Sequence, residues 1–492
     1  MPTALAAPMT HDPLLTKLFA EALACQKGGN LAGTLLAYKR IHKQFPDFQD
    51  AWVNAAMLLI RLGRYEEALV AAEKAFDLDG GSHTSYLLLA EAHYWLGHVG
   101  NTAKQFEVAY GHYLKVLEYN PKNAIAMLRM SEICCAAGFY DTALGMSNAA
   151  VRLEPKNAYA HFCRGKAGLY LADYAGAESD FRRTIELEDD YADAHQSLTF
   201  VLLITGRYKE GWSHMRASGK GFFGAHWHDF GKPRWNGEPL EGKTLLVYGH
   251  REVSGYGDNI QFARFLPRIK ERFGNPQIVL YANETQRRLF KDLPGMDIFV
   301  LKGDPLPHFD VTVPMWGLAM ATDTDLPDLP PPAPMTPREP PPALPELDRP
   351  GLKVGLTWSA SIGRRLETSA FDVLADIPGV AWYGLQVPPS ENPPRLPGFI
   401  DMAPHCGDFY DAAQVARQMD LVVSVDTAMA HLAGSLNVPT VVLVLHPLPD
   451  WRWGMGESAD WYPSAKVLRQ PLREAPESVV RLLKAEIEHR VQ

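Results

Sequence analysis

The chain has 492 residues, which is more than one ordinary hydrophobic core supports, so we expect at least two domains. Its 47% hydrophobic and 21% charged residues are typical of a globular protein. A net charge of -9 without a concentrated basic patch excludes nucleic acid and anionic membranes as the main partners. Five scattered cysteines favour buried, reduced thiols, and no signal peptide or apolar membrane-spanning run is recognisable. The sequence therefore predicts a cytoplasmic location without membrane insertion.

A period of 34 residues organises the first 210 residues of the chain. After one longer step of 41 residues the spacing returns to 34, and the positions that keep it are Gly29, Gly63, Gly97, Gly138, Ala172 and Gly206. Small residues where two helices touch, glycine at the turn and proline at the exit are typical of the tetratricopeptide repeat. Seven extra residues between Gly80 and Pro121 predict one unit that is about two helical turns longer. We predict an all-α solenoid over residues 12–220, with five full units and a partial sixth.

The first helix of each pair should line a concave surface of this solenoid. Apolar side chains dominate the predicted inward set, with Glu91, Glu132 and Lys166 among them. This pattern predicts a groove for a docked helix or an extended peptide. The alternative is that the same side chains pack against neighbouring repeats. The candidate groove residues are Tyr94, Leu128, Phe162 and Phe200.

From Thr244 onwards, strand-like runs such as TLLVYG and QIVLYA alternate with helical ones. This alternation is typical of parallel, Rossmann-like α/β layering. Eleven of the 24 residues from 327 to 350 are proline, a density that excludes a helix or a central strand and predicts an extended linker. We predict one α/β half over residues 221–326 and another over 351–492, which ends in a closing helix. Two such halves describe the GT-B architecture, whose active site is the cleft between them.

The stretch SVDTAMAHLAGSLNVPTVVLV, residues 424–444, combines a buried strand with the start of a helix. The strand should end at Asp426 and the helix begin at Thr427, where amides without intrahelical partners suit a phosphate. His431 lies four residues after Thr427 on the same face, so it can point at the same ligand. Asp426 would repel a phosphate, and we expect it to cap the helix.

The segment DTAMAHLAGSLNVP resembles the D-T-x-x-x-H-L-A segment of heptosyltransferase-type glycosyltransferases, family 9. The chain also contains PDWRWG (449–454), WYPSAKVLRQ (461–470) and PRWNGEPLEGKTLLVYG (233–249). With these motifs it resembles, over essentially its whole length, the bacterial group that fuses tetratricopeptide repeats to such a domain. The resemblance implies a GT-B glycosyltransferase, as in cytoplasmic flagellin glycosyltransferases. The fused architecture is also similar to O-GlcNAc transferase.

The resemblance also implies a catalytic residue in GYGDNIQFARFL. In the family, a glycine and an aspartate open the helix after the first strand, and the aspartate is regarded as the base that deprotonates the acceptor hydroxyl. The matching residues here are Gly257 and Asp258. A carboxylate within hydrogen-bond reach supplies this chemistry, whereas the alternative is a plain helix cap. The chain has HREVS at 250–254 where the family tends to show Glu-Gln-Gly, which implies different recognition near Asp258.

The resemblance places a nucleotide-sugar donor on the C-terminal half. Relatives carry a polar and basic loop after the KVGLTWS strand, where Arg364 and Arg365 could neutralise the leaving diphosphate. Each arginine could instead be a solvated loop residue, and the relatives' Asn-Pro in this loop is missing. The remaining candidate donor-binding residues are Ser359, Gln386, Asp426, Thr427, Ala428 and His431.

We expect neither a metal nor a cofactor. The DTD motif at residues 323–325 adjoins the proline-rich linker without a buried strand before it, and no cluster has metal-ligand spacing. A helix dipole and arginines would then supply the electrostatic stabilisation.

The sequence thus predicts an inverting glycosyltransferase that acts on a Ser or Thr hydroxyl of a protein held by the repeats, with flagellin as a candidate acceptor. Two alternatives are a binding scaffold with a degenerate transferase domain and a heptosyltransferase for lipopolysaccharide.

Overall fold

In the computed structural model, the described residues are 12–219, 228–249, 255–360, 365–390, 392–447 and 449–492. They fall into two compact units, Met1–Asp189 and Asp190–Gln492. The division lies one helix pair before the predicted boundary at residue 220. Each unit is described by itself.

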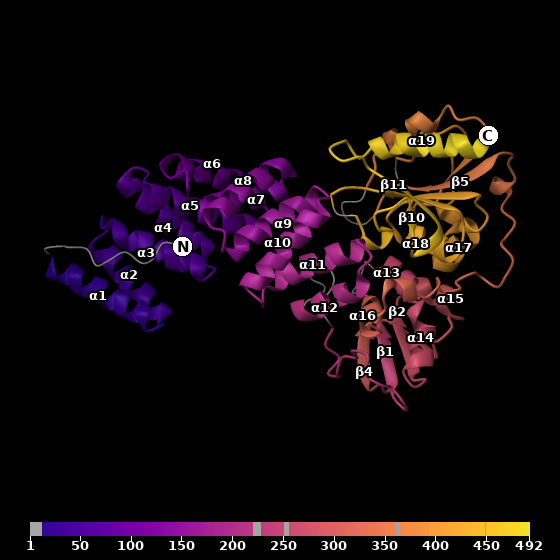
Figure 1. Cartoon of the computed structure of the whole chain (residues 1–492), viewed down its shortest axis with the longest axis horizontal. Coiled ribbons are helices and arrows are strands. Elements are labelled where there is room, and N and C mark those ends of the chain that lie inside the picture. Colours follow the sequence, from indigo (N-terminus) through magenta and orange to yellow (C-terminus); the bar gives the residue numbers. More distant parts are fainter. Residues whose placement is uncertain (1–11, 220–227, 250–254, 361–364, 391, 448) are drawn as a thin grey trace. The chain divides into compact units, whose positions relative to one another are not determined.

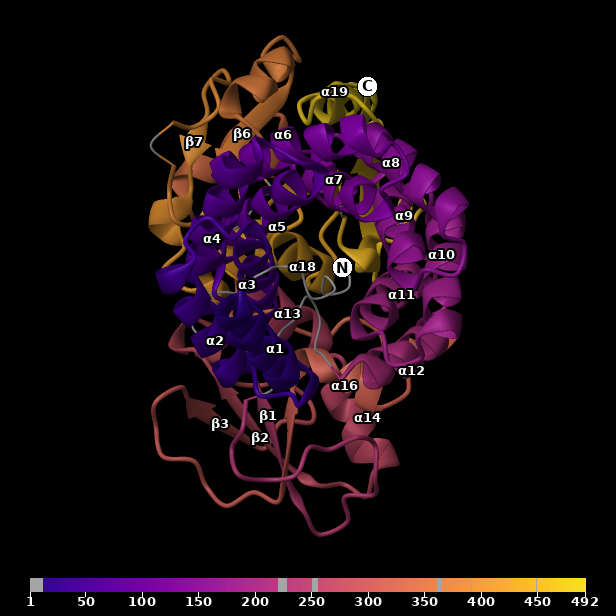
Figure 2. The same ribbon diagram turned by 90° about the vertical axis from the view of Figure 1, so that its left-hand side faces the viewer.

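The described part of the first unit consists of five helix pairs, which Figure 2 shows stacked one on the next in a curved array. Each pair packs its small residues, for example Ala56 and Ala72, where the two helices touch. The 34-residue period of the sequence therefore corresponds to tetratricopeptide-like pairs of helices. The helices are α1 (Pro13–Lys27), α2 (Leu31–Gln44), α3 (Gln49–Arg61), α4 (Tyr65–Asp79), α5 (His83–Gly100), α6 (Ala103–Tyr119), α7 (Ala124–Ala136), α8 (Tyr140–Leu153), α9 (Ala158–Tyr170) and α10 (Tyr174–Leu187).

The periodic glycines serve two different purposes. Gly29, Gly63 and Gly138 have φ angles of 74°, 72° and 83°, so they occupy left-handed turns between paired helices, as predicted. Gly97 does not, because it lies inside the 18-residue helix α5, and the left-handed turn falls at Asn101 instead. A Cβ atom at Gly97 would lie 2.9 Å from the ring of Phe106, so glycine there permits the close approach of α6. The extra residues of this unit therefore lengthen α5 and α6.

The cysteines give a direct test of this packing. Cys134, Cys135, Cys163 and Cys406 are buried, and burial raises the pKa of Cys135 to about 11 and that of Cys406 to about 12. Because the thiolate is the nucleophile, these groups should react slowly at neutral pH. We expect Ellman's reagent to titrate one thiol rapidly in the native chain, the partly exposed Cys25, and all five after unfolding in guanidinium. Rapid reaction of a second native thiol would contradict the packing.

The second unit begins with one more helix pair, α11 (Ala192–Ile204) and α12 (Tyr208–Ser218). A four-stranded parallel sheet follows, in the order β3-β2-β1-β4. Its interior strands are almost continuously apolar, as expected for a parallel sheet that is covered on both faces. The elements of this N-terminal half are β1 (Thr244–Tyr248), α13 (Tyr256–Phe262), α14 (Phe265–Arg272), β2 (Gln277–Ala282), α15 (Arg287–Phe290), β3 (Ile298–Leu301), β4 (Val311–Pro314) and α16 (Leu318–Ala321).

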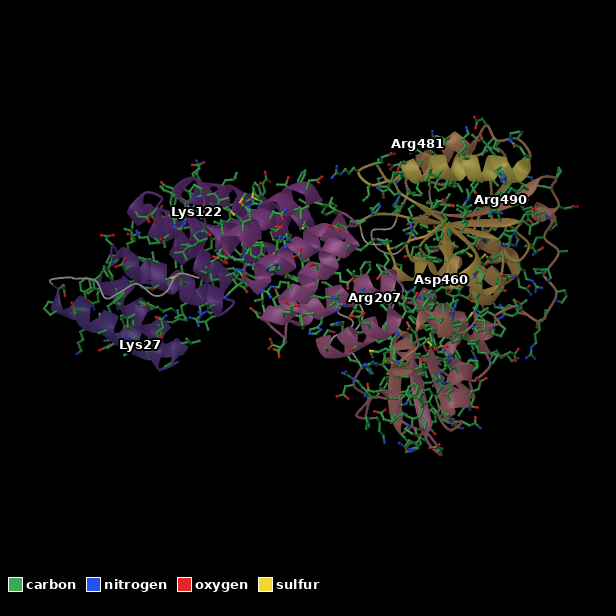
Figure 3. The ribbon with its side chains drawn as sticks, viewed as in Figure 1. Lys27, Lys122, Arg207, Asp460, Arg481 and Arg490 are labelled. Atoms are coloured by element: carbon green, nitrogen blue, oxygen red, sulfur yellow. The ribbon has the colours of Figure 1, made fainter. Side chains whose placement is uncertain are left out.

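A seven-stranded sheet forms the C-terminal half, in the order β10-β11-β9-β8-β5-β6-β7, with only the β10–β11 pair antiparallel. The closing helix α19 packs its apolar side, including Val480, Leu483 and Ile487, against this sheet (Figure 1). Its exposed Arg481 and Arg490 are labelled in Figure 3. The elements are β5 (Leu352–Thr357), β6 (Val380–Gly384), β7 (Ile400–Asp401), α17 (Phe409–Ala416), β8 (Leu421–Val425), α18 (Ala428–Ser435), β9 (Thr440–Val444), the 3-10 turn η8 (Trp451–Trp453), β10 (Ser458–Ala459), β11 (Tyr462–Arg469) and α19 (Ser478–Val491).

Helix α12 bonds to both halves, which explains why the division into units lies before it. The indole nitrogen of Trp212 donates to the Thr324 carbonyl at 2.7 Å, in the N-terminal half. The indole nitrogen of Trp461, in the C-terminal half, donates to the Tyr208 hydroxyl at 2.8 Å. The ring of Trp451 packs edge-on against both Tyr208 and Trp212. The last helix pair therefore shares its core with the α/β halves.

The proline-rich segment, residues 327–350, runs extended apart from two short 3-10 turns at Leu326–Asp328 and Pro345–Leu347. It is fixed to its surroundings by side chains. Arg417 donates to the carbonyls of Pro337 and Glu339 at 3.0 and 3.2 Å, and Arg264 donates to that of Pro330 at 3.2 Å. Outside these turns the segment forms neither helix nor strand, and it is bound to both α/β halves.

Candidate functional site

Asp258 lies in the first turn of α13, the first described helix after β1 of the N-terminal half. The N-cap position is Gly255, with a φ of 97°, so Asp258 is not the helix cap. Its carboxylate oxygen Oδ1 accepts hydrogen bonds from Gln261 Nε2 at 2.9 Å and from Arg452 Nη2 at 3.1 Å. About 28% of the side chain is exposed, so a ligand can reach it.

The helix that carries Asp258 packs tightly against the start of α18 in the other half. A Cβ atom at Gly257 would lie 2.8 Å from Cδ2 of His431 and 3.4 Å from the Cα of Ala428. Only a glycine permits this approach without displacing a neighbour. The structure therefore brings the predicted base and the predicted phosphate-binding helix together.

Replacing Gly257 with alanine should disturb this junction. The added methyl group would overlap the buried His431 ring, and overpacking of this kind costs about 1–3 kcal/mol. We expect a lower melting temperature in differential scanning calorimetry. The matched control is Gly456→Ala in the same unit, because a Cβ atom there meets nothing closer than 3.8 Å. Equal effects of the two substitutions would contradict the close approach.

The start of α18 differs in one detail from the prediction. Thr427, not Asp426, is the N-cap, and its Oγ1 accepts from the Met429 amide at 3.2 Å. Threonine takes this role because its hydroxyl reaches the first-turn amides directly. The Asp426 carboxylate instead lies 3.7 Å from Nε2 of His431, and both side chains are buried. The expectation that Asp426 caps the helix was wrong.

The motif PDWRWG supplies a buried aromatic and charged layer beside this helix. Trp453 stacks on His431 with ring centroids 5.1 Å apart and an interplanar angle of 12°. Trp451 and Trp453 are fully buried, so they anchor the segment. Between them, Arg452 Nη2 donates to Asp450 Oδ2 at 2.6 Å and to Asp258 Oδ1. Burial alone lowers the pKa of Arg452, but the charges of Asp450 and Asp258 outweigh it and hold that pKa above its usual value.

The other candidate donor-binding residues lie around the loop after β5. Gln386 Oε1 accepts from the backbone amides of Trp358 and Ser359, at 3.3 and 3.0 Å, so it holds this loop in place. Ser359 pairs with Arg365 in an isolated antiparallel bridge, and the Arg365 side chain is 59% exposed. Arg364 and the HREVS stretch lie outside the described residues.

A second link between the halves lies at the start of α17. Arg288 of α15 contacts two carboxylates of the other half, Asp408 at 3.2 Å and Asp411 at 2.9 Å. The rings of Tyr256 and Phe409 lie 5.1 Å apart beside them. Asp408 and Phe409 therefore contact the N-terminal half through Arg288 and Tyr256.

The predicted groove residues of the repeats are mostly buried. Tyr94, Leu128 and Phe162 are 2%, 0% and 7% exposed, so they pack between helices, and the accessible lining predicted for them was wrong. The reason is the register of these helices, which turns the large side chains into the contacts between repeats. Phe200 is partly exposed but lies on α11, in the second unit.

A largely buried network of polar side chains joins α5, α7 and α9 in this unit. Arg129 donates to Glu91 and Glu132 at 3.2 Å each and to the Tyr159 hydroxyl at 2.6 Å. Glu132 also accepts from Tyr94 at 2.5 Å. Burial, followed by the charge of Glu132, raises the pKa of Tyr94. One small apolar hollow adjoins this network, lined by Met57, Ile60, Thr84, Leu87, Leu88, Glu91 and Ile125.

Sequence reasoning missed the pairing of Arg452 with Asp258. The arginine was visible within PDWRWG, flanked by tryptophans and preceded by Asp450, which is a signal for a buried charge. The second carboxylate that Arg452 binds, that of Asp258, lies 194 residues earlier in the chain, and no local sequence pattern links the two residues.

Among the described residues, no helix combines the length and the apolarity required to cross a bilayer.

The family model for the tetratricopeptide repeat supports the repeat assignment. It matches residues 49–81, which contain α3 and α4. Protein FlbA of Caulobacter vibrioides is 24% identical over 506 residues, covering 90% of this chain and 79% of that protein. DnaJ homolog subfamily C member 7 of Homo sapiens is 31% identical over 93 residues, 19% of each chain. A solved tetratricopeptide repeat protein from Parabacteroides merdae is 16% identical with a TM-score of 0.35, covering 41% of this chain and 77% of its own.

Proposed function

We propose that the chain is a metal-independent GT-B glycosyltransferase that moves a sugar from a nucleotide-sugar donor to a hydroxyl of a protein acceptor in the cytoplasm. The observation that carries this proposal is the junction between α13 and α18. A carboxylate from one α/β half lies beside the N-terminal turn of a helix from the other half, with Gly257 against His431 and Ala428. Acceptor activation and phosphate binding require this pair of features at one place.

In the proposed reaction, the amides that open α18 hold the donor diphosphate, and Thr427 fixes that turn. Asp258 takes the proton of the acceptor hydroxyl as its oxygen attacks the anomeric carbon. A new carbon–oxygen bond forms on one face of the sugar. The bond to the diphosphate breaks on the other face, and its electron pair leaves with the nucleotide. This geometry inverts the anomeric carbon.

The repeats support a protein acceptor. Tetratricopeptide arrays present extended concave surfaces that bind other proteins, and residues 49–81 match the repeat family. The apolar hollow between α3, α5 and α7 suits an aliphatic side chain of such a partner. We propose that the acceptor is a protein with exposed Ser or Thr residues, and flagellin is the first to test.

The experiment incubates the full chain with UDP-, GDP-, ADP- and CMP-linked sugars, first alone and then with flagellin. A productive donor should raise the melting temperature, because a ligand at about 100 times its Kd stabilises the native state by about 2.7 kcal/mol. It should also add one sugar mass to the acceptor in intact-protein mass spectrometry. The matching nucleoside without phosphates is the control. Donor binding without transfer to any hydroxyl-bearing protein would contradict the proposal.

A protein-binding scaffold is the second candidate, because the tetratricopeptide repeats are supported by a family match at residues 49–81. In that case none of the nucleotide sugars changes the melting temperature, while capture of a protein partner by residues 12–189 persists.

A further inference from the structure

Arg452 joins the two α/β halves through a single nitrogen atom. Nη2 lies 2.6 Å from Asp450 Oδ2, within its own half, and 3.1 Å from Asp258 Oδ1, in the other half. Nε of the same guanidinium is buried and has no hydrogen-bond partner within the part of the chain that the structure describes. The charge-assisted hydrogen bonds that the structure gives for Arg452 therefore go to the carboxylates of Asp450 and Asp258.

Asp450, Arg452 and Asp258 differ in exposure: the first two side chains are buried, and the third is accessible to a ligand. The side chains of Asp450 and Arg452 are 4% and 8% exposed, whereas that of Asp258 is 28% exposed. A buried ion pair with a fixed geometry can hold a third, accessible group in one position. Asp450 thus orients Arg452, and Arg452 presents its second N–H to the carboxylate that a ligand can reach.

We propose that Arg452 is the positioning residue of the site: it fixes the Asp258 carboxylate at the junction of the two halves and keeps it ionised, ready to accept a proton. This inference rests on the proposed function. It assigns no contact between Arg452 and the substrate.

Other charged or titratable groups around Arg452 set the strength of this effect. Asp426 and Asp450 add negative charge and Arg264 adds positive charge, while Tyr208 and Tyr462 are neutral near pH 7 because burial raises the pKa of each. His431 pairs with Asp426. Because acids predominate, removal of Arg452 leaves Asp258 beside other carboxylates. An opposite charge at this range lowers the pKa of an aspartate by about 1–3 units, and its loss reverses that shift.

The test is the pH dependence of kcat/KM for sugar transfer by the full chain, comparing wild type with Arg452→Met and Arg452→Lys. Transfer requires ionised Asp258, so the rate falls on the acid side as this group is protonated. We expect Arg452→Met to move that acid limb upward by about 1–3 pH units. In Arg452→Lys the acid limb should lie close to its wild-type position, because one ammonium nitrogen can donate to both carboxylates.

Structural damage is separated from this effect by two further variants. Arg264→Met removes another buried arginine between the halves, one that donates to the carbonyls of Gln261, Pro330 and Trp461. It should lower the melting temperature but move the acid limb much less. If Arg452→Met does not fold, the double variant Asp450→Asn, Arg452→Met replaces it, since it leaves no second buried charge without its partner.

The outcomes separate the two proposals. An active wild type with an unchanged acid limb in the folded Arg452→Met variant overturns the role of Arg452 and leaves the transferase intact. A folded but inactive Met variant supports the role only if Lys restores transfer, and overturns it if Lys does not. A wild type that transfers no sugar at any pH overturns the proposed function and, with it, the role of Arg452.

Discussion

Replacement of Asp258 by Asn should lower kcat for sugar transfer by about 10²–10⁴-fold, the usual contribution of a general base. The amide has nearly the same shape and still accepts hydrogen bonds from Gln261 and Arg452, but it cannot take a proton. Donor binding should persist, because the α18 turn is unchanged. The measurement is steady-state kinetics, with donor-dependent melting temperature as the check on binding.

Asp372→Asn is the matched control, because this aspartate is exposed in the same unit and lies in a 3-10 turn outside the site. It should leave kcat, KM and the melting temperature unchanged. Undiminished transfer by Asp258→Asn would remove Asp258 from the mechanism. A higher KM with an unchanged kcat would reduce its role to binding.

A fragment that begins at residue 221 should fail to fold, whereas one that begins at residue 190 should fold. The shorter fragment lacks α11 and α12, so Trp451 and Trp461 lose the rings and the hydroxyl that cover them. Losing one large aromatic core residue costs about 3–5 kcal/mol, and domains are stable by only about 5–15 kcal/mol. Soluble yield and the near-ultraviolet circular dichroism of the two fragments are the measurements.

A point substitution separates packing from chain length. Trp212→Ala in the full chain should cost about 3–5 kcal/mol and lower the melting temperature of the unit that contains both sheets. Ser213→Ala, which changes the adjacent exposed residue of α12, should have almost no effect. If the fragment from residue 221 is as stable as the one from 190, the last helix pair is not part of that core.

Regular features of the fold could be predicted because they repeat along the sequence. The 34-residue period and the alternation of strands and helices each reflect one local rule applied many times. Gly97 shows where this reasoning ends: the period assigned it to a turn, but the same residue type also permits close packing, and the Phe106 ring that decides between them belongs to another helix. Tyr94 and Leu128 were misplaced for a related reason, since a small rotation of a helix moves a side chain from groove to core.

The candidate site divides in the same way. Thr427 could be selected because it opens a helix after a strand, His431 because it lies four residues later on the same face, and Asp258 through the family resemblance; the structure brings α13 and α18 together. The partner of Asp258 could not be selected, because long-range ion pairs follow from the packing of two halves rather than from spacing. Arg364 and HREVS lie outside the described residues, so their roles stay predictions.

The bonds to the proline-rich segment have a consequence for how that segment can evolve. Proline has no N–H, so a run of prolines offers its surroundings only carbonyl acceptors. The backbone carbonyls of Asp328, Pro330, Pro337, Glu339 and Pro340 accept hydrogen bonds from four donor side chains, which are Arg264, Arg268, Gln414 and Arg417. An Arg417→Glu change would leave the carbonyls of Pro337 and Glu339 facing a carboxylate, and Pro337 has no N–H to offer it instead. The proline-rich segment and the donor side chains that bind its carbonyls are therefore expected to change together during evolution.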